Sequence, residues 1–324
     1  MKAFVLGQDG PAISEIAAPK PGPEDILVRV RACALNRADL GMARGHMHGG
    51  AGGAGAVLGL EWAGEIVETG AGVTGFKAGD RVMGSGSGAF AEYTVADFGR
   101  VASIPDSNLS YERAAALPVA LQTMHDAIVT NGALQRGQAV LIQGASSGVG
   151  LMGMRIAKFM GAQLVIGSST DDARRARLSE FGADLAIDSR DPDWPKAVLD
   201  ATGGAGVDLI VDQISSGQVN QNLRATKILG RIVNVGRLGG TKGEFDFDLH
   251  ALRRISYIGV TFRTRTKAEV REINKRMRAD LWAGVQSGAL SLPIDKIFAF
   301  EDLPEAFAHM AANKHLGKIA VSVG

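Results

Sequence analysis

A run of small residues from Gly144 to Gly150 is the stretch of this chain best suited to bind a charged ligand. It follows an apolar segment of strand length at residues 139–143 and precedes residues 148–160, which are apolar at helical spacing and end before Gly161. A strand, a tight turn and a helix in this order present free backbone N–H groups and a partial positive charge to an anion. The pattern predicts a pyrophosphate site, with a turn that binds nothing as the open alternative. The residues expected to bind are Ser146, Ser147, Gly148, Val149 and Gly150.

The strand that follows, at residues 163–168, indicates which dinucleotide is bound. It ends about 20 residues past the first glycine, where an NAD-binding fold carries an Asp or Glu for the ribose 2′-hydroxyl. This chain has Ser169 there, and Arg174 and Arg175 follow it. Small hydroxyls and a guanidinium suit a 2′-phosphate; two intervening aspartates oppose this interpretation but also suit the start of a helix. We therefore predict NADPH as the cofactor, with Ser169 and Arg174 at its 2′-phosphate.

The composition and charge of the chain narrow the remaining possibilities. A length of 324 residues suggests two domains, and 46% hydrophobic with 21% charged residues is typical of a globular protein. A net charge of +1 argues against a nucleic-acid partner, and no apolar run reaches the length of about 18 residues that a membrane span needs. The N-terminal apolar segment is too short for a signal peptide. The single cysteine, Cys33, excludes an internal disulfide and a multi-cysteine zinc lobe, and it predicts a cytoplasmic location.

Residues 1–120 have the pattern of a β-rich domain. Short segments rich in β-forming residues recur between turn signals, at residues 2–6, 26–32, 61–68, 81–84 and 91–95. This regular spacing predicts a partly closed barrel. Residues 43–55 hold a glycine cluster with His46 and His48, and we expect a mobile loop there. Two histidines two residues apart could bind a metal, but with no third ligand in view, a role as solvated loop residues is the simpler alternative.

The second half of the chain alternates strand and helix patterns, which predicts a parallel sheet in a doubly wound domain. Helices are expected at residues 171–180, 192–201 and 219–229, and strands at residues 185–187, 207–212, 231–236 and 257–262. Ligands bind at the carboxyl ends of the strands in such folds. A further helix at residues 268–287 has a basic face, which we expect to be exposed to solvent.

Several short motifs occur together in a fixed order, at residues 59–67 (GLEWAGEIV), Gly70, Val73, residues 77–82 (KAGDRV), residues 89–93 (AFAEY) and residues 144–150. They resemble the signature of the medium-chain dehydrogenase/reductase superfamily and, within it, the zinc-independent quinone oxidoreductase (zeta-crystallin-like) group. The resemblance covers essentially the full chain. It implies an α/β protein with a GroES-like, partly open β-barrel catalytic domain and a Rossmann cofactor domain with a doubly wound parallel sheet. The family's terminal helix and strand return to the first domain, so the catalytic domain is expected at residues 1–120 and 263–324 and the Rossmann domain at residues 121–262.

The chain departs from the zinc alcohol dehydrogenases of that superfamily. The positions that match their zinc ligands, a cysteine, a histidine and a second cysteine, are Asn36, Leu60 and Val119. None can serve as the family's ligand, so no metal is expected, and alcohol oxidation lacks the Lewis acid that would stabilise an alkoxide. The quinone reductase branch typically has an asparagine here, as this chain does, and the resemblance implies that Asn36 is catalytic. The residues implied for the substrate pocket are Asp39, His46 and His48.

The same resemblance implies further contacts to the cofactor. Thr123 is expected near the nicotinamide, with a purely structural place in a helix that follows a proline as the alternative. The strand that ends at Phe262 is expected to border the cofactor, and Lys318 in the terminal strand is expected to contact it. In the family, a strand of this kind can pair across subunits, so we expect a homodimer or a homotetramer. The residues expected along the nicotinamide half are Asn234, Val235 and Gly236.

These features predict a hydride transfer. A nicotinamide carries the hydride, while the protein orients it and excludes water. With no metal, the acceptor has to be electrophilic by itself, as a quinone or an α,β-unsaturated carbonyl is. Our first hypothesis is NADPH-dependent quinone reduction by hydride transfer from C4 of the nicotinamide. Asn36 would donate a hydrogen bond to the carbonyl oxygen of this small-molecule electrophile as negative charge grows there.

Two alternatives remain open. Reduction of an alkenal, enone or enoyl double bond benefits from a proton donor beside the α carbon, and enoyl-reductase relatives typically use a tyrosine. None of the three tyrosines lies in the region 37–55 where the donor is expected, which favours the quinone, although His46 or His48 could substitute. The other alternative is a non-catalytic NADPH-binding protein, and the near-zero net charge argues against one that binds RNA.

Overall fold

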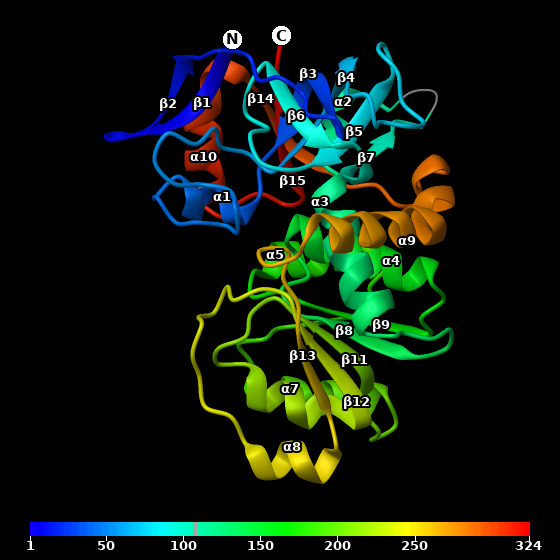
Figure 1. Cartoon of the computed structure of the whole chain (residues 1–324). Helices are drawn as coiled ribbons and strands as arrows, with labels where there is room; N and C mark the ends of the chain where they lie inside the picture. Colours follow the sequence, from blue (N-terminus) through cyan, green and yellow to red (C-terminus); the bar gives the residue numbers. More distant parts are fainter. Residues whose placement is uncertain (106–108) are drawn as a thin grey trace. The chain divides into compact units, whose positions relative to one another are not determined.

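The computed structural model describes residues 1–105 and 109–324, which form two compact units (Figure 1). The first unit comprises Met1–Val119, Phe262–Gln286 and Ser291–Gly324, and the second comprises Ala120–Thr261 and Ser287–Leu290. The first unit is therefore assembled from segments far apart in the sequence, whereas the second is nearly continuous. Within the described residues, none of the helices combines the length and the apolar content that crossing a membrane requires.

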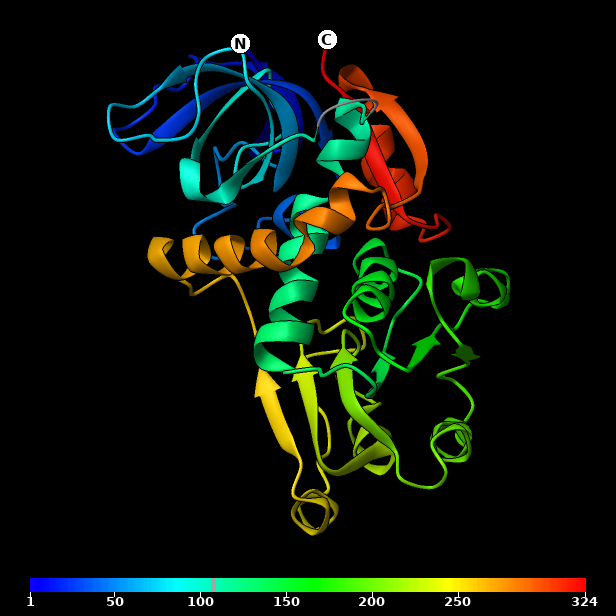
Figure 2. The same ribbon diagram turned by 90° about the vertical axis from the view of Figure 1, so that its right-hand side faces the viewer.

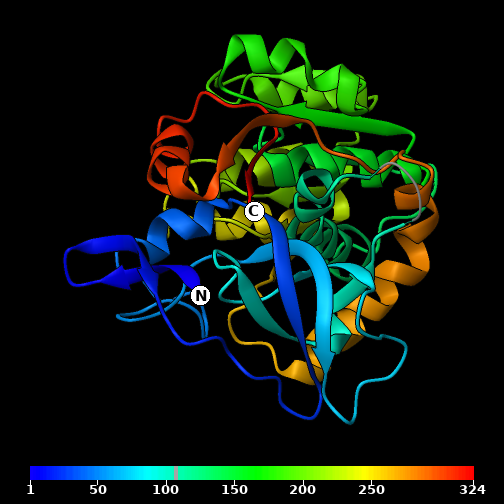
Figure 3. The ribbon, with the colours of Figure 1, turned by 90° about the horizontal axis from the view of Figure 1, so that it is seen from above.

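A seven-stranded sheet forms the frame of the first unit. Its order is β14-β15-β3-β4-β5-β7, and β6 pairs with β3 as well. The strand β3 thus has three partners, and its pairing with β4 is visible in Figure 3, where β3 is blue and β4 light blue. A hairpin of β1 (Lys2–Gly7) and β2 (Gly10–Glu15) lies outside this sheet. The strands of the sheet are β3 (Asp25–Ala34), β4 (Glu61–Thr69), β5 (Arg81–Ser85), β6 (Tyr93–Asp97), β7 (Val101–Ser103), β14 (Ile294–Ala299) and β15 (Lys318–Ser322).

Alternating apolar residues explain why β3 forms and which face it buries. Ile26, Val28 and Val30 are buried at every second position, as expected for a strand with one face on a core. They belong to a cluster that includes Trp62 and Phe90. From residue 32 to residue 36 every residue of the chain is buried, so the end of β3 leads into the interior of the first unit.

The longest helix of the first unit is α9 (Lys267–Gln286), and its basic face is not simply solvated. Arg271 forms ion pairs with Asp97 at 2.6 Å and with Glu24 at 3.0 Å, and Arg278 donates to the Val101 carbonyl at 3.0 Å. The expectation of a solvent-exposed face was therefore wrong for these two arginines, because acidic and carbonyl groups of other segments face them. The other helices that begin in this unit are α1 (Arg37–Met42), α2 (Tyr111–Ala115), α3 (Pro118–His125) and α10 (Leu303–Ala311), with 3-10 turns η1 (Phe98–Arg100) and η4 (Phe300–Asp302).

Six parallel strands form the sheet of the second unit, in the order β10-β9-β8-β11-β12-β13 (Figure 2). The order runs outward in both directions from the β8–β11 pair, which is the switch point of a doubly wound sheet. The strands are β8 (Ala139–Ile142), β9 (Leu164–Ser168), β10 (Leu185–Ile187), β11 (Val207–Asp212), β12 (Thr226–Asn234) and β13 (Ser256–Gly259). The helical segments are η2 (Asp126–Asn131), α4 (Gly148–Phe159), α5 (Asp172–Ala176), η3 (Leu178–Phe181), α6 (Trp194–Ala201), α7 (Val219–Ala225) and α8 (Phe247–Arg253). The predicted fold class, a GroES-like domain plus a Rossmann domain, is confirmed.

The strand β12 departs most from the sequence-based expectation. The helix expected at residues 219–229 ends at Ala225, and the strand begins at once. Its register against β11 jumps from the pair Val207–Thr226 to the pair Leu209–Arg231, so residues 227–230 bulge out of the ladder. The strand expected at residues 257–262 also ends early, at Gly259, and Phe262 belongs to the first unit.

Candidate active site

A buried charged cluster lies where three strands of the first unit begin or end. The antiparallel strands β15 and β3 pair with Ala320 opposite Ala34, and the same register carried two residues further places Lys318 opposite Asn36. The strand β4 pairs with another edge of β3 and begins at Glu61. The three strands therefore bring an ammonium, a carboxamide and a carboxylate to one point.

Hydrogen bonds satisfy both ions of this cluster. The Lys318 Nζ donates to the Leu35 carbonyl and to Asn36 Oδ1, both at 2.9 Å, and to the Glu61 carboxylate. Asn36 Nδ2 donates to Glu61 Oε1 at 2.9 Å, and the backbone N–H of Val119 donates to Oε2 at 2.8 Å. The side chains of Lys318 and Glu61 are only 3% and 0% exposed. A buried ion pair is tolerated only where further hydrogen bonds complete its shell, as they do here.

Asp39 is a further ionisable group beside this cluster. Its carboxylate accepts the backbone N–H of Asn36 through Oδ2 at 2.6 Å, and Oδ1 has no hydrogen-bond partner among the described residues. Burial raises the pKa of Asp39 to about 7; the Asn36 N–H and Lys318 oppose this rise, and Glu61 adds to it. Asp39 therefore changes its protonation state close to neutral pH, which the sequence pattern did not predict.

The two histidines expected at the substrate pocket lie in the irregular segment that follows α1. His46 is exposed, and His48 is half-buried and forms a two-residue bridge with Ala51. Burial, and then the charge of Arg263, lower the pKa of His48, so it is neutral at pH 7. Nowhere in residues 1–105 and 109–324 do three His, Cys, Asp or Glu side chains group as a metal ion would require. The place of both histidines in a substrate pocket stays a prediction.

In the second unit, the turn between β8 and α4 has the geometry that an anion needs. Ser147 is the N-cap of α4, and its Oγ accepts the N–H of Gly150 at 3.0 Å. A Cβ atom at Gly150 would lie 2.6 Å from the Gly144 carbonyl oxygen, so the helix packs directly on the backbone of the turn. This turn and the first residues of the 12-residue helix have the chemistry that a pyrophosphate requires, and the contact itself stays a prediction.

A network of hydrogen bonds between buried polar side chains holds this turn in place. Ser168 Oγ accepts the N–H of Gly144 at 3.0 Å and donates to Gln143 Oε1 at 2.5 Å. Gln143 donates to Asn222 at 2.9 Å, and Asn222 donates to the buried carboxylate of Asp212 at 3.1 Å. This network was not among the features predicted from the sequence. The available signal was a polar residue at the carboxyl end of two apolar strands, Gln143 after β8 and Asp212 in β11.

The residues expected at the 2′-phosphate lie together after β9. Ser169 Oγ is hydrogen-bonded to Ser146 Oγ at 3.0 Å, which joins this segment to the glycine turn. Arg175 donates a hydrogen bond to the Ser169 carbonyl at 3.1 Å and forms ion pairs with Asp172 and Asp188. Arg174 has an ion pair with Asp171 through Nε, at the longer distance of 3.6 Å. Arg174 is therefore the guanidinium more available to a phosphate.

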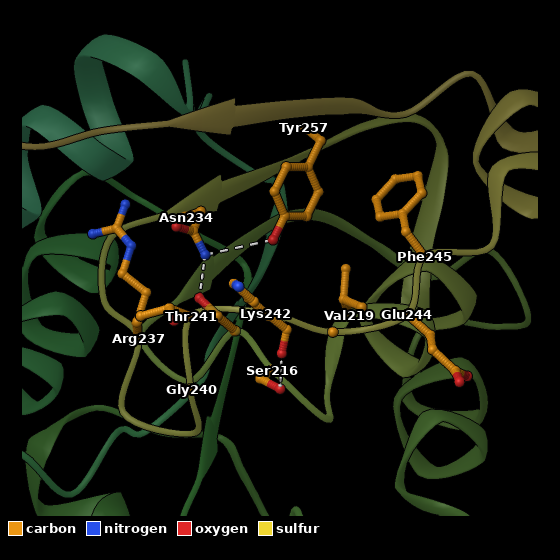
Figure 4. A pocket seen from close by; sticks show the side chains of 12 residues that line it. Ser216, Val219, Asn234, Arg237, Gly240, Thr241, Lys242, Glu244, Phe245 and Tyr257 are labelled. Carbon is orange, nitrogen blue, oxygen red and sulfur yellow. Dashed lines mark hydrogen bonds between the residues drawn. The ribbon is translucent and has the colours of Figure 1, made fainter.

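A pocket of about 220 Å³ lies beyond the carboxyl end of β12 (Figure 4). Asn234, the last residue of β12, lines it and donates to Ser215 Oγ and, at 3.4 Å, to the Tyr257 hydroxyl. Phe245 and Tyr257 meet edge to face with ring centroids 5.8 Å apart and form an aromatic wall. Lys242 adds a cation to the lining. Aromatic and polar groups at a strand end are typical of a small-molecule site.

The remaining residues predicted for the cofactor are spread over both units. The backbone N–H groups of Val235 and Gly236 donate to the Asp212 carbonyl at 2.8 and 3.2 Å. Thr123 is half-buried in α3, within the second unit, whereas Phe262 and Lys318 belong to the first. The ammonium of Lys318 directs hydrogen bonds to three partners of its own unit. The cofactor contacts of all these residues stay predictions.

The chain is similar in sequence and fold to two kinds of known protein, polyketide synthases and quinone oxidoreductases. Two family models match, "Alcohol dehydrogenase GroES-like domain" at residues 22–106 and "Zinc-binding dehydrogenase" at residues 148–278. One component of the phenolphthiocerol/phthiocerol polyketide synthase of Mycobacterium tuberculosis is 31% identical over 96% of this chain, which spans only 14% of that protein's length. Quinone oxidoreductase-like protein 2 of Bos taurus is 28% identical over 97% of this chain and 89% of its own. The structure of a Pseudomonas syringae pv. tomato quinone oxidoreductase matches with a TM-score of 0.86 and 25% identity, over 99% of both chains.

The packing of the glycine turn predicts a specific effect of one methyl group. Gly150→Ala is expected to weaken NADPH binding by about tenfold or more, because its Cβ forces the turn and the helix apart. Gly153→Ala is the matched control on the same helix, since its Cβ meets only the flexible side chain of Met124, at 3.0 Å. Fluorescence titration with NADPH measures both affinities. Equal losses in the two variants would contradict a role of the turn.

The raised pKa of Asp39 predicts a pH dependence of stability. Its folded pKa of about 7 exceeds the usual value of about 3.9, so its contribution to stability is present at low pH and is lost as the pH rises from about 4 to 7. Asp39→Asn is expected to remove this loss. The difference in free energy of unfolding, variant minus wild type, should therefore rise by up to about 1.4 kcal/mol for each pH unit between pH 5 and 7. Urea unfolding measures this difference, with exposed Asp9→Asn as the control. A constant difference across that range would contradict the assignment.

Proposed function

Because the chain belongs to the medium-chain dehydrogenase/reductase superfamily, in its zinc-independent, quinone oxidoreductase-like group, we propose that it reduces a quinone with NADPH. The bovine relative and the Pseudomonas structure, which match nearly the whole chain, are both named for quinone oxidoreductases. The observation that carries the proposal is the buried Asn36 carboxamide, held by hydrogen bonds to an ammonium and a carboxylate. It is a fixed donor for an oxygen that gains negative charge.

Each of the two units supplies groups that have a task in the proposed reaction. NADPH, when bound, supplies a hydride from C4 of its nicotinamide. The backbone N–H groups at the start of α4 bind the pyrophosphate, and Arg174 binds the 2′-phosphate. Asn36 donates an N–H to the carbonyl oxygen of the quinone while that oxygen becomes negative. The proton that completes the reduction comes from solvent or from a nearby donor.

A second candidate is the reduction of a C=C bond conjugated to a carbonyl. The similarity to a polyketide synthase, at 31% identity, is the observation that favours it. In that reaction the β carbon accepts the hydride and the α carbon needs a proton, while Asn36 keeps the same contact to the carbonyl oxygen. His48, with its lowered pKa, is neutral at pH 7 and is a poor proton source there. The two reactions therefore differ in the proton donor they require.

We also propose that the chain assembles as a homodimer or a homotetramer. Among the described residues, β13 is at the edge of the second unit's sheet and pairs with β12 alone. Phe247 and Leu252 of α8 are 77% and 73% exposed. An open strand edge and exposed apolar side chains are common features of subunit interfaces. The cytoplasmic location stays a prediction from the sequence.

The choice of acceptor is tested by the oxidation of NADPH with a simple quinone and with a simple enal. We expect faster turnover with the quinone and no effect of a metal chelator. Asn36→Ala is expected to lower kcat by about 100-fold, because the oxyanion loses its donor. Faster turnover with the enal would support the second candidate instead. Binding of NADPH without turnover of any acceptor would mean a non-catalytic protein, and inhibition by the chelator would contradict a zinc-independent mechanism.

The preference for NADPH is tested at Arg174. Arg174→Ala is expected to raise the Kd for NADPH by about tenfold or more and to leave that for NADH within about twofold, since only NADPH has the 2′-phosphate. Arg177→Ala is the matched control, because Arg177 is half-exposed and pairs with Glu180 at 2.9 Å. Equal effects of Arg174→Ala on both nucleotides would remove the guanidinium from the 2′-phosphate site.

A further inference from the structure

We propose that Glu61 and Lys318 are positioning residues, which orient and polarise the Asn36 carboxamide so that one of its N–H groups is presented to the acceptor. This inference rests on the proposed function of Asn36. It assigns to Lys318 a task different from the cofactor contact that the sequence predicted, and it gives Glu61 a task for the first time. Neither residue needs to touch the substrate for this role.

The two ions determine which way the carboxamide faces. A carboxamide has an acceptor end and a donor end, and the two are interchanged by a flip. Here Oδ1 faces the Lys318 ammonium at 2.9 Å, and Nδ2 faces the Glu61 carboxylate at 2.9 Å. A flipped amide would set N–H groups against the ammonium and an oxygen against the carboxylate, so both contacts would become repulsive. The ion pair therefore selects a single orientation.

The contact with the ammonium also strengthens the remaining donor. Nδ2 carries two N–H groups, and its hydrogen bond to Glu61 is the one it makes within the part of the chain that the structure describes. The ammonium on Oδ1 draws electron density away from the amide nitrogen, which makes the second N–H a stronger donor. Asn36 is only 7% exposed, so this polarisation acts where water screens it little.

The ions are themselves held in place by backbone groups. The Leu35 carbonyl binds the ammonium at 2.9 Å, and the Val119 N–H binds the second oxygen of Glu61 at 2.8 Å. A glutamine at position 61 cannot replace this arrangement, because its NH2 group would face either the Val119 N–H or the donors of Asn36 and Lys318, where this chain has a carboxylate oxygen. Three paired strands carry the set, so its geometry exists before any substrate arrives.

The test is a double-mutant cycle on kcat between Asn36 and Lys318, with the acceptor that turns over fastest. Lys318→Met is expected to lower kcat by about tenfold or more and to leave the Kd for NADPH within about twofold. In the Asn36→Ala background the same change is expected to alter kcat by less than about twofold, since no carboxamide is left to position. Lys318→Arg is expected to recover part of the loss. Lys314→Met, at an exposed lysine in the preceding loop, is the control.

The outcomes separate the inference from the proposed function. If Lys318→Met and Asn36→Ala reduce kcat by factors that multiply, the pair is merely structural and the inference is overturned, while quinone reduction stands. If Asn36→Ala leaves kcat unchanged, the proposed role of Asn36 fails first. Lys318→Met leaves Glu61 buried without its cation, so thermal unfolding is measured alongside. Should that variant fail to fold, Glu61→Gln/Lys318→Met, which buries no unpaired ion, takes its place in the same cycle with the same expected result.

Discussion

The burial of one positive and one negative charge at the meeting point of β15, β3 and β4 is the main constraint on the first unit. Removing an ammonium and a carboxylate from water costs several kcal/mol each, so the surrounding chain has to supply their hydrogen bonds. It does so from two backbone groups and from Asn36. A slip of one residue in either strand pair would turn Lys318 or Glu61 to the opposite face of the sheet. The requirement that fixes the register therefore also fixes the position of the candidate catalytic amide.

The second unit positions its groups by a related principle, with mostly neutral partners. The hydroxyl of Ser168 accepts the N–H of Gly144 and so anchors the turn. The same hydroxyl donates to Gln143, which in turn donates to Asn222. The chain of hydrogen bonds ends at Asp212, and burial raises the pKa of that carboxyl. In both units the groups suited to chemistry stand at strand ends, and buried polar side chains hold them there. Loops alone would leave these groups more freedom.

Local patterns were sufficient to predict much of this architecture. The strands β10 and β11 have the predicted bounds, and the glycine turn lies where its small residues and flanking apolar runs indicate. The pairing of Glu61 with Lys318 could not be predicted, because 257 residues separate them and no periodicity relates them. The early end of α7 also escaped prediction, since the bulge in β12 depends on its register with β11. These two features depend on contacts between residues far apart in the sequence, which local patterns do not predict.

The discontinuous build of the first unit has a consequence for the order in which the protein assembles. Glu61 leaves the ribosome early, while Lys318 follows only after the entire second unit has been synthesised. Until then the carboxylate has no cation, and its burial is opposed by the cost of desolvation. The sheet of the first unit is therefore expected to be completed only after β15 has been synthesised, whereas the nearly continuous second unit is free to fold beforehand. The pairing of β15 with β3 therefore brings Lys318 to Glu61, and the candidate active site is completed in the same step that completes the sheet of the first unit.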